Sequence, residues 1–106
     1  MTNAIQRLND AFRRTFVGGR VMLTAGINAL PADDVAVILS RVRSFNEFTT
    51  ANDPYKQHDM ASFEYKGQRI FWKIDYYDRN LRYLSEDPTD VSKTIRVLTI
   101  MCADEY

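Results

Sequence analysis

Residues 61–78 have the sequence ASFEYKGQRIFWKIDYYD, in which two runs of alternating side chains flank Gly67-Gln68. Strict alternation is typical of β-strands, and a glycine in the first position of a two-residue loop favours a type II′ turn. The expected hairpin pairs Phe63 with Trp72. One of its faces then carries the side chains that we expect to form the core: Ala61, Phe63, Tyr65, Ile70, Trp72, Ile74 and Tyr76.

The opposite face of the hairpin combines aromatic and charged side chains: His58, Met60, Ser62, Glu64, Phe71, Lys73, Asp75 and Tyr77. Aromatic residues among charges are common at protein interfaces. The alternative is an ordinary solvated face with a cross-strand ion pair of Glu64 with Lys73 or Arg69. We predict protein-binding residues on this face and on the adjacent polar loop, residues 52–59: Phe71, Lys73, Asp75, Tyr77, Asp53, Tyr55 and His58.

The segments around the hairpin predict further elements. Apolar stripes and end signals indicate helices at residues 3–16, from Pro31 onward and from Asp87-Pro88 to the last residues, and short strands at residues 20–25 and 81–84. The order is helix, strand, helix, hairpin, short strand, helix. We therefore expect a single small α+β domain over residues 1–106, with helices on one face of a mostly antiparallel sheet.

The composition of the chain argues against nucleic acid and membranes as binding partners. The 106 residues carry 14 basic and 14 acidic side chains, so no overall field favours nucleic acid or an anionic membrane. No apolar run approaches the roughly 18–20 residues that cross a bilayer. The single Cys102 cannot form an internal disulfide, which favours the reducing cytoplasm. We expect a cytoplasmic protein without a nucleic-acid or membrane partner.

A metal-dependent enzyme or nuclease is the alternative hypothesis. Its candidate residues are His58, Asp59, Glu64, Lys66 and Asp75. The Glu-x-Lys spacing at residues 64–66 occurs in one class of metal-dependent nuclease, but any strand that ends in a charged turn can produce it. A catalytic triad is implausible because Ser62 and His58 are roughly 13 Å apart along a strand. We expect no catalytic residues, no cofactor and no metal.

Two further segments leave alternatives open. Arg7, Arg13 and Arg14 project from the first predicted helix, where they could contact phosphates or form a solvated helix face; the zero net charge favours the latter. The last segment, TIRVLTIMCADEY, has a broad apolar surface. It fits either a helix that completes the core or one that also forms a homodimer.

Six strings together resemble a known family: LNDAFRR, GGRVMLTAG, NDPYKQHD, FWKIDYYD, SEDP and RVLTIMCADEY. The family contains small bacterial proteins classed as a domain of unknown function, often found on plasmids, prophages and other mobile elements. The resemblance implies a small cytosolic accessory protein and supplies no catalytic residues. Such a protein is expected to bind a host or element-encoded protein without being an enzyme, for example as an anti-CRISPR or anti-restriction inhibitor of host defence.

Overall fold

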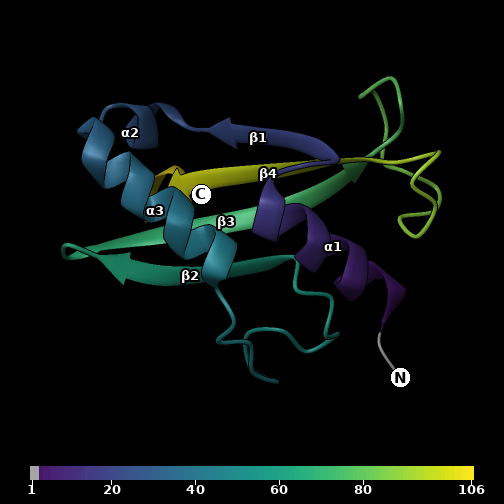
Figure 1. The fold of residues 1–106 in the computed structure, drawn as a ribbon, viewed down its shortest axis with the longest axis horizontal. Coiled ribbons are helices and arrows are strands. Elements are labelled where there is room, and N and C mark those ends of the chain that lie inside the picture. Colours follow the sequence, from purple (N-terminus) through teal and green to yellow (C-terminus); the bar gives the residue numbers. More distant parts are fainter. Residues whose placement is uncertain (1–2) are drawn as a thin grey trace.

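A four-stranded mixed sheet with two long helices on one face forms the protein in the computed structural model, which describes residues 3–106 (Figure 1). The helices are α1 (Ala4–Thr15), α2 (Ala25–Asn28) and α3 (Ala32–Ser44), and the strands are β1 (Gly19–Leu23), β2 (Met60–Tyr65), β3 (Gln68–Tyr77) and β4 (Ile95–Cys102), followed by the 3₁₀ turn η1 (Ala103–Glu105). The strand order is β1-β4-β3-β2, with β1 parallel to β4 and the other pairs antiparallel. The predicted α+β fold with a mostly antiparallel sheet is confirmed.

The helix α1 begins where the sequence predicts. The Asn3 side chain accepts hydrogen bonds from the backbone N–H groups of Ile5 and Gln6, which otherwise lack partners in a helix. The helix ends at Thr15, one residue before the predicted end at residue 16. Phe16 itself takes the left-handed conformation, with φ of 60°, and its N–H donates to the Phe12 carbonyl.

The hairpin has a different register from the predicted one but the predicted faces. Lys66 and Gly67 form the turn with positive φ angles of 50° and 82°, so Tyr65 is opposite Gln68 rather than Ile70. Two residues with positive φ are typical of a type I′ turn. The pairing is shifted by two residues, which leaves every side chain on its expected face. The core face is confirmed, with Tyr65 and Tyr76 only half-buried.

The predicted C-terminal helix is wrong. Residues 95–102 form β4, which lies between β1 and β3, and only turns occupy residues 87–93. The apolar spacing fits both a helical stripe and an alternating strand, but the segment is rich in β-branched residues, which favour a strand. The predicted short strand at 81–84 is also wrong, apart from a single bridge between Tyr77 and Leu84.

The hydrophobic core lies between the helices and the sheet. It joins Phe12 of α1 and Val42 of α3 to Trp72 of β3, and the Trp72 side chain is completely buried. Burying each such side chain contributes roughly 1.5–3 kcal/mol. Within residues 3–106, no helix has the length and apolar character needed to cross a membrane.

Candidate functional site

The sheet has one face that α1 and α3 do not cover, which we call the open face (Figure 1). Alternation along each strand assigns its side chains, because residues opposite one another in the register share a face. They are Arg20 and Met22 of β1, Ile95, Val97, Thr99 and Met101 of β4, Arg69, Phe71, Lys73, Asp75 and Tyr77 of β3, and Met60, Ser62 and Glu64 of β2. Met22 and Met60 are exposed, although both are apolar.

A groove of about 430 Å³ crosses the open face. Its lining residues come from β3, β4, the N-cap of α2 and the C-terminal turn: Thr24, Lys73, Asp75, Tyr77, Val97, Thr99, Met101, Glu105 and Tyr106. Two of these residues form an ion pair, with the Lys73 ammonium 3.0 Å from the Asp75 carboxylate. This hydrogen bond raises the pKa of Lys73, so its ammonium group stays charged at neutral pH.

Aromatic rings extend this surface beside the charged pair. The Tyr106 ring packs against Phe71 with centroids 5.5 Å apart, and Tyr77 lines the groove. The four predicted hairpin residues, Phe71, Lys73, Asp75 and Tyr77, therefore lie together on one strand. Sequence reasoning missed Tyr106, because a C-terminal helix would have directed this residue elsewhere.

The predicted loop residues lie apart from the open face. His58 lies two residues before β2 and has a φ of 54°. Its ring stacks on the Phe48 ring, with the ring centroids 3.8 Å apart. Its Nδ1 lies 2.9 Å from an Asp10 carboxylate oxygen of α1. The expectation that His58 lies on the outer face of the hairpin is therefore wrong, because the left-handed residue interrupts strand alternation before Met60.

The other two loop residues differ in their surroundings. Asp53 is buried, and its carboxylate accepts hydrogen bonds from the backbone N–H groups of Gln57 and His58. Tyr55 is 78% exposed, and its carbonyl accepts a hydrogen bond from the Asn3 side chain. Of the three predicted loop residues, only Tyr55 presents its side chain fully to solvent.

The residues of the enzyme hypothesis do not converge on one point. Each has its own partner: His58 with Asp10, Asp59 with Tyr76, Glu64 with Arg69, Lys66 with Asp34 and Asp75 with Lys73. Burial raises the pKa of Asp59 and raises that of Tyr76 to about 12, so the Tyr76 hydroxyl stays protonated and donates to Asp59. The contacts of His58 and Asp59 hold the end of the loop against α1 and β3.

Arg13 does not project into solvent as the sequence suggested. It is 1% exposed, and its Nη1 donates to the carbonyls of Val42 and Arg43 at the end of α3, at 2.8 and 3.2 Å. Its Nη2 pairs with Asp10 at 3.0 Å. The side chain therefore joins α1 to the negative end of α3 and is not available to a phosphate.

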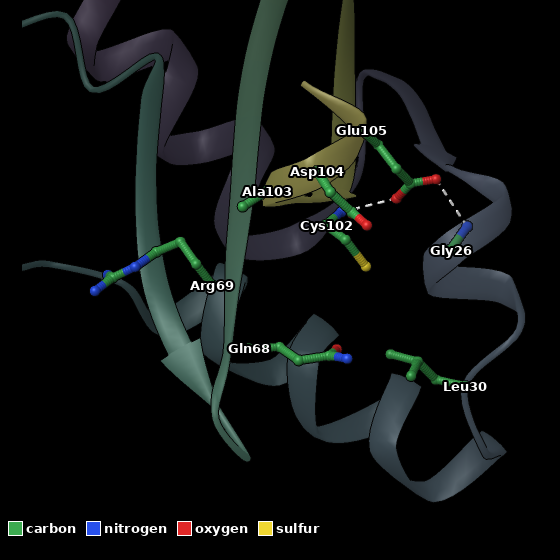
Figure 2. A pocket seen from close by; sticks show the side chains of 8 residues that line it. All are labelled: Gly26, Leu30, Gln68, Arg69, Cys102, Ala103, Asp104 and Glu105. Atoms are coloured by element: carbon green, nitrogen blue, oxygen red, sulfur yellow. Dashed lines mark hydrogen bonds between the residues drawn. The ribbon is translucent and has the colours of Figure 1, made fainter.

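A second cavity, of about 460 Å³, lies between α2, the hairpin turn and the C-terminal turn (Figure 2). The Glu105 carboxylate accepts hydrogen bonds from the Thr24 hydroxyl and from the N–H groups of Cys102 and Gly26. The Thr24 bond is the main reason that the pKa of Glu105 falls to about 2. The cavity is thus built around a carboxylate whose oxygens are already occupied.

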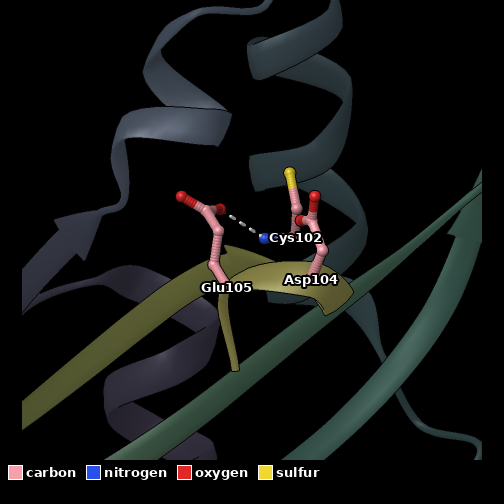
Figure 3. Close-up of side chains that lie close together, drawn as sticks. All are labelled: Cys102, Asp104 and Glu105. Carbon is pink, nitrogen blue, oxygen red and sulfur yellow. Dashed lines mark hydrogen bonds between the residues drawn. The ribbon is translucent and has the colours of Figure 1, made fainter.

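Cys102, Asp104 and Glu105 bring three metal-ligating atoms within 4.8 Å of one another (Figure 3). Metals bind the thiolate form of cysteine, but burial raises the pKa of Cys102. Glu105 is held by backbone donors, as Figure 3 shows for the Cys102 N–H. In the part of the chain that the structure describes, no other group of three such side chains lies close enough to share an ion. We interpret the cluster as structural, because Glu105 joins the C-terminal turn to the start of α2 through its hydrogen bonds with Thr24 and Gly26.

Comparison with known proteins places the chain in a family. The model of a family described as a protein of unknown function (DUF3768) matches residues 23–105. No curated protein and no solved structure matches the chain. The match runs from the end of β1 to η1 and includes the whole hairpin. The resemblance stated from the sequence strings is confirmed: the chain belongs to the DUF3768 family of proteins of unknown function.

Proposed function

We propose that this chain is a cytoplasmic, non-enzymatic protein that binds another protein through the open face. The observation that supports the proposal is the arrangement on that face. A charged pair, Lys73 with Asp75, lies in a groove between the aromatic side chains of Phe71, Tyr77 and Tyr106. Aromatic residues at the centre of an interface carry much of the binding energy, and charges fix orientation.

The framework beneath the open face favours recognition without rearrangement. Trp72 and Ile74 alternate with the proposed binding residues along β3 and are buried in the core. Binding side chains on a central strand are positioned more precisely than those on a loop. A preformed surface loses little conformational entropy when a partner binds.

Two sets of substitutions test the proposal. Replacing both Phe71 and Tyr77 by alanine should remove partner binding. The charge exchange Lys73→Asp with Asp75→Lys keeps a local ion pair and reverses the charges presented to a partner, so it should also weaken binding. Tyr83→Ala is the matched control, because Tyr83 is an exposed aromatic residue outside the sheet.

Affinity capture from host-cell lysate, quantified by mass spectrometry, is the measurement. A partner retained by the wild type and by the Tyr83→Ala variant, but lost from both open-face variants, is the expected result. Equal recovery with all four baits would refute the proposal. Light scattering of the purified chain distinguishes a second copy as the occupant, since the open-face variants would then be monomers.

The family resemblance adds a narrower proposal about the partner. We propose that it is a host or element-encoded protein, with components of CRISPR and restriction systems as the first to test. Purified defence complexes can be assayed with and without the protein. Inhibition that is lost in the open-face variants would support this role, and unaffected activity would contradict it.

A further inference from the structure

A groove on the helix side of the protein carries a feature that the open face does not explain. It has a volume of about 500 Å³ and lies along α1. Its lining is mainly apolar: Leu8, Ala11, Phe12, Thr15, Val17, Gly18, Val91 and Arg96. We call it the α1 groove. Val17 and Val91 are 74% and 60% exposed, so apolar surface continues beyond the groove.

The one charged residue of this lining is Arg96 of β4, which is 4% exposed. Its Nε donates to the Asn9 side-chain oxygen at 2.8 Å, and its Nη2 donates to the Pro88 carbonyl at 2.6 Å. The guanidinium also lies 5.2 Å from the centre of the Tyr76 ring. All of these partners are neutral.

No carboxylate forms an ion pair with Arg96 in residues 3–106. Arg13, which is equally buried, shows the contrast, because Asp10 lies 3.0 Å from it. Burial lowers the pKa of the Arg96 guanidinium. A buried cation without a counterion is unfavourable, and a bound anion would offset that cost.

One guanidinium nitrogen of Arg96 remains for a ligand. Nη1 has no hydrogen-bond partner among the described residues. It is also not among the unpaired nitrogens sealed from solvent, which are Arg13 Nε and Trp72 Nε1. Nη1 therefore has access to solvent from a residue that lines the α1 groove.

From these observations we infer that the α1 groove binds a small carboxylate with an apolar tail. The carboxylate pairs with Arg96, and the tail lies against Leu8, Phe12 and Val91. The ligand carboxylate would supply the counterion that Arg96 lacks, and the apolar lining would contact the ligand tail. A volume of about 500 Å³ is within the range of small-molecule sites.

Three probes of increasing specificity test this site. Sodium octanoate supplies both charge and tail, 1-octanol supplies the tail alone, and propionate supplies the charge with almost no tail. Titration followed by amide chemical shifts in NMR should show saturable octanoate binding with shifts on α1 and at the start of β4. A hydrogen bond to a charged group predicts binding about tenfold or more tighter for octanoate than for octanol.

Matched substitutions locate the binding. Val91→Asp places a carboxylate at the groove and should weaken octanoate binding about tenfold or more. Val37→Asp is the control, since Val37 is an exposed valine on α3, and it should leave binding unchanged. Arg96→Met should remove the preference for octanoate over octanol. If the Arg96→Met variant does not fold, the comparison of Val91→Asp with Val37→Asp still tests the site.

The outcomes separate clearly. Lack of saturable octanoate binding, equal affinity for octanol, equal loss in the two aspartate variants, or shifts confined to other regions would each overturn the inference. The site is independent of the proposed protein interface. Octanoate binding should therefore persist when Phe71 and Tyr77 are replaced by alanine.

Discussion

Replacing Arg13 by methionine tests the contact that joins the two long helices. Methionine retains an unbranched apolar side chain between Phe48 and Trp72, whose rings lie 5.5 and 5.2 Å from the guanidinium. It removes the hydrogen bonds to the end of α3 and the ion pair with Asp10. The substitution thus separates the polar role of Arg13 from its packing.

The expected cost follows from the burial of the pair. Removing one partner of a buried ion pair costs about 3–5 kcal/mol. Asp10 keeps its contact with His58 when Arg13 is replaced, which favours the lower end of this range. Methionine also removes the buried Nε of Arg13, which has no hydrogen-bond partner, and this gain reduces the cost. We therefore expect a loss near the lower value, about 3 kcal/mol. For a domain of this size, that lowers Tm by about 12 °C or more.

Chemical and thermal unfolding of the wild type, Arg13→Met and Arg14→Met measure the effect. Arg14 is exposed on the same helix, so its substitution should change the free energy of unfolding by less than about 0.5 kcal/mol. A difference below about 1 kcal/mol between the two variants would show that the buried contacts of Arg13 contribute little net stability. That result would refute the claim that Arg13 stabilises the packing of α1 on α3.

Two other substitutions test local geometry. Gly19→Ala should destabilise the protein by about 1–3 kcal/mol in urea unfolding, because its Cβ would collide with the Arg96 carbonyl and approach the Phe12 ring to 2.8 Å; unchanged stability would contradict this close approach. In the folded protein the pKa of Glu105 is about 2, below the ordinary 4.5. The ionised carboxylate therefore stabilises the fold fully above about pH 4.5, and this stabilisation is lost as the pH falls toward 2. Glu105→Gln should make the free energy of unfolding depend less on pH in this range. Identical acid limbs for the wild type and this variant would exclude that contribution.

The hairpin shows how a sequence can predict the faces of a sheet and still mislead about pairing. Alternation alone determines which side chains face the core, and Trp72 and Ile74 are buried as expected. The turn position depends on which residues accept a positive φ, and here Lys66 does so beside Gly67. Since the error in pairing is two residues, the predicted open face keeps its members.

The C-terminal segment could not be assigned from local pattern. Leu98 and Met101 fit a helical stripe, whereas Leu98 and Ile100 fit a strand with one buried face. Its position between β1 and β3 decides between them, because both edges of the segment then form backbone hydrogen bonds. This long-range pairing also brings Tyr106 beside Phe71, which explains why the sequence revealed only part of the candidate site.

The strand order has a consequence for synthesis of the protein. Within residues 3–106, β4 is the last strand but lies second in the sheet, and it is the only strand that pairs with β1. A nascent chain can form the hairpin of β2 and β3 early, because its contacts are local. Both edges of β1 stay unpaired until residues 95–102 have left the ribosome and formed β4. Folding of this sheet is therefore completed only after β4 has been synthesised, and protection of β1 by a chaperone would matter most before that point.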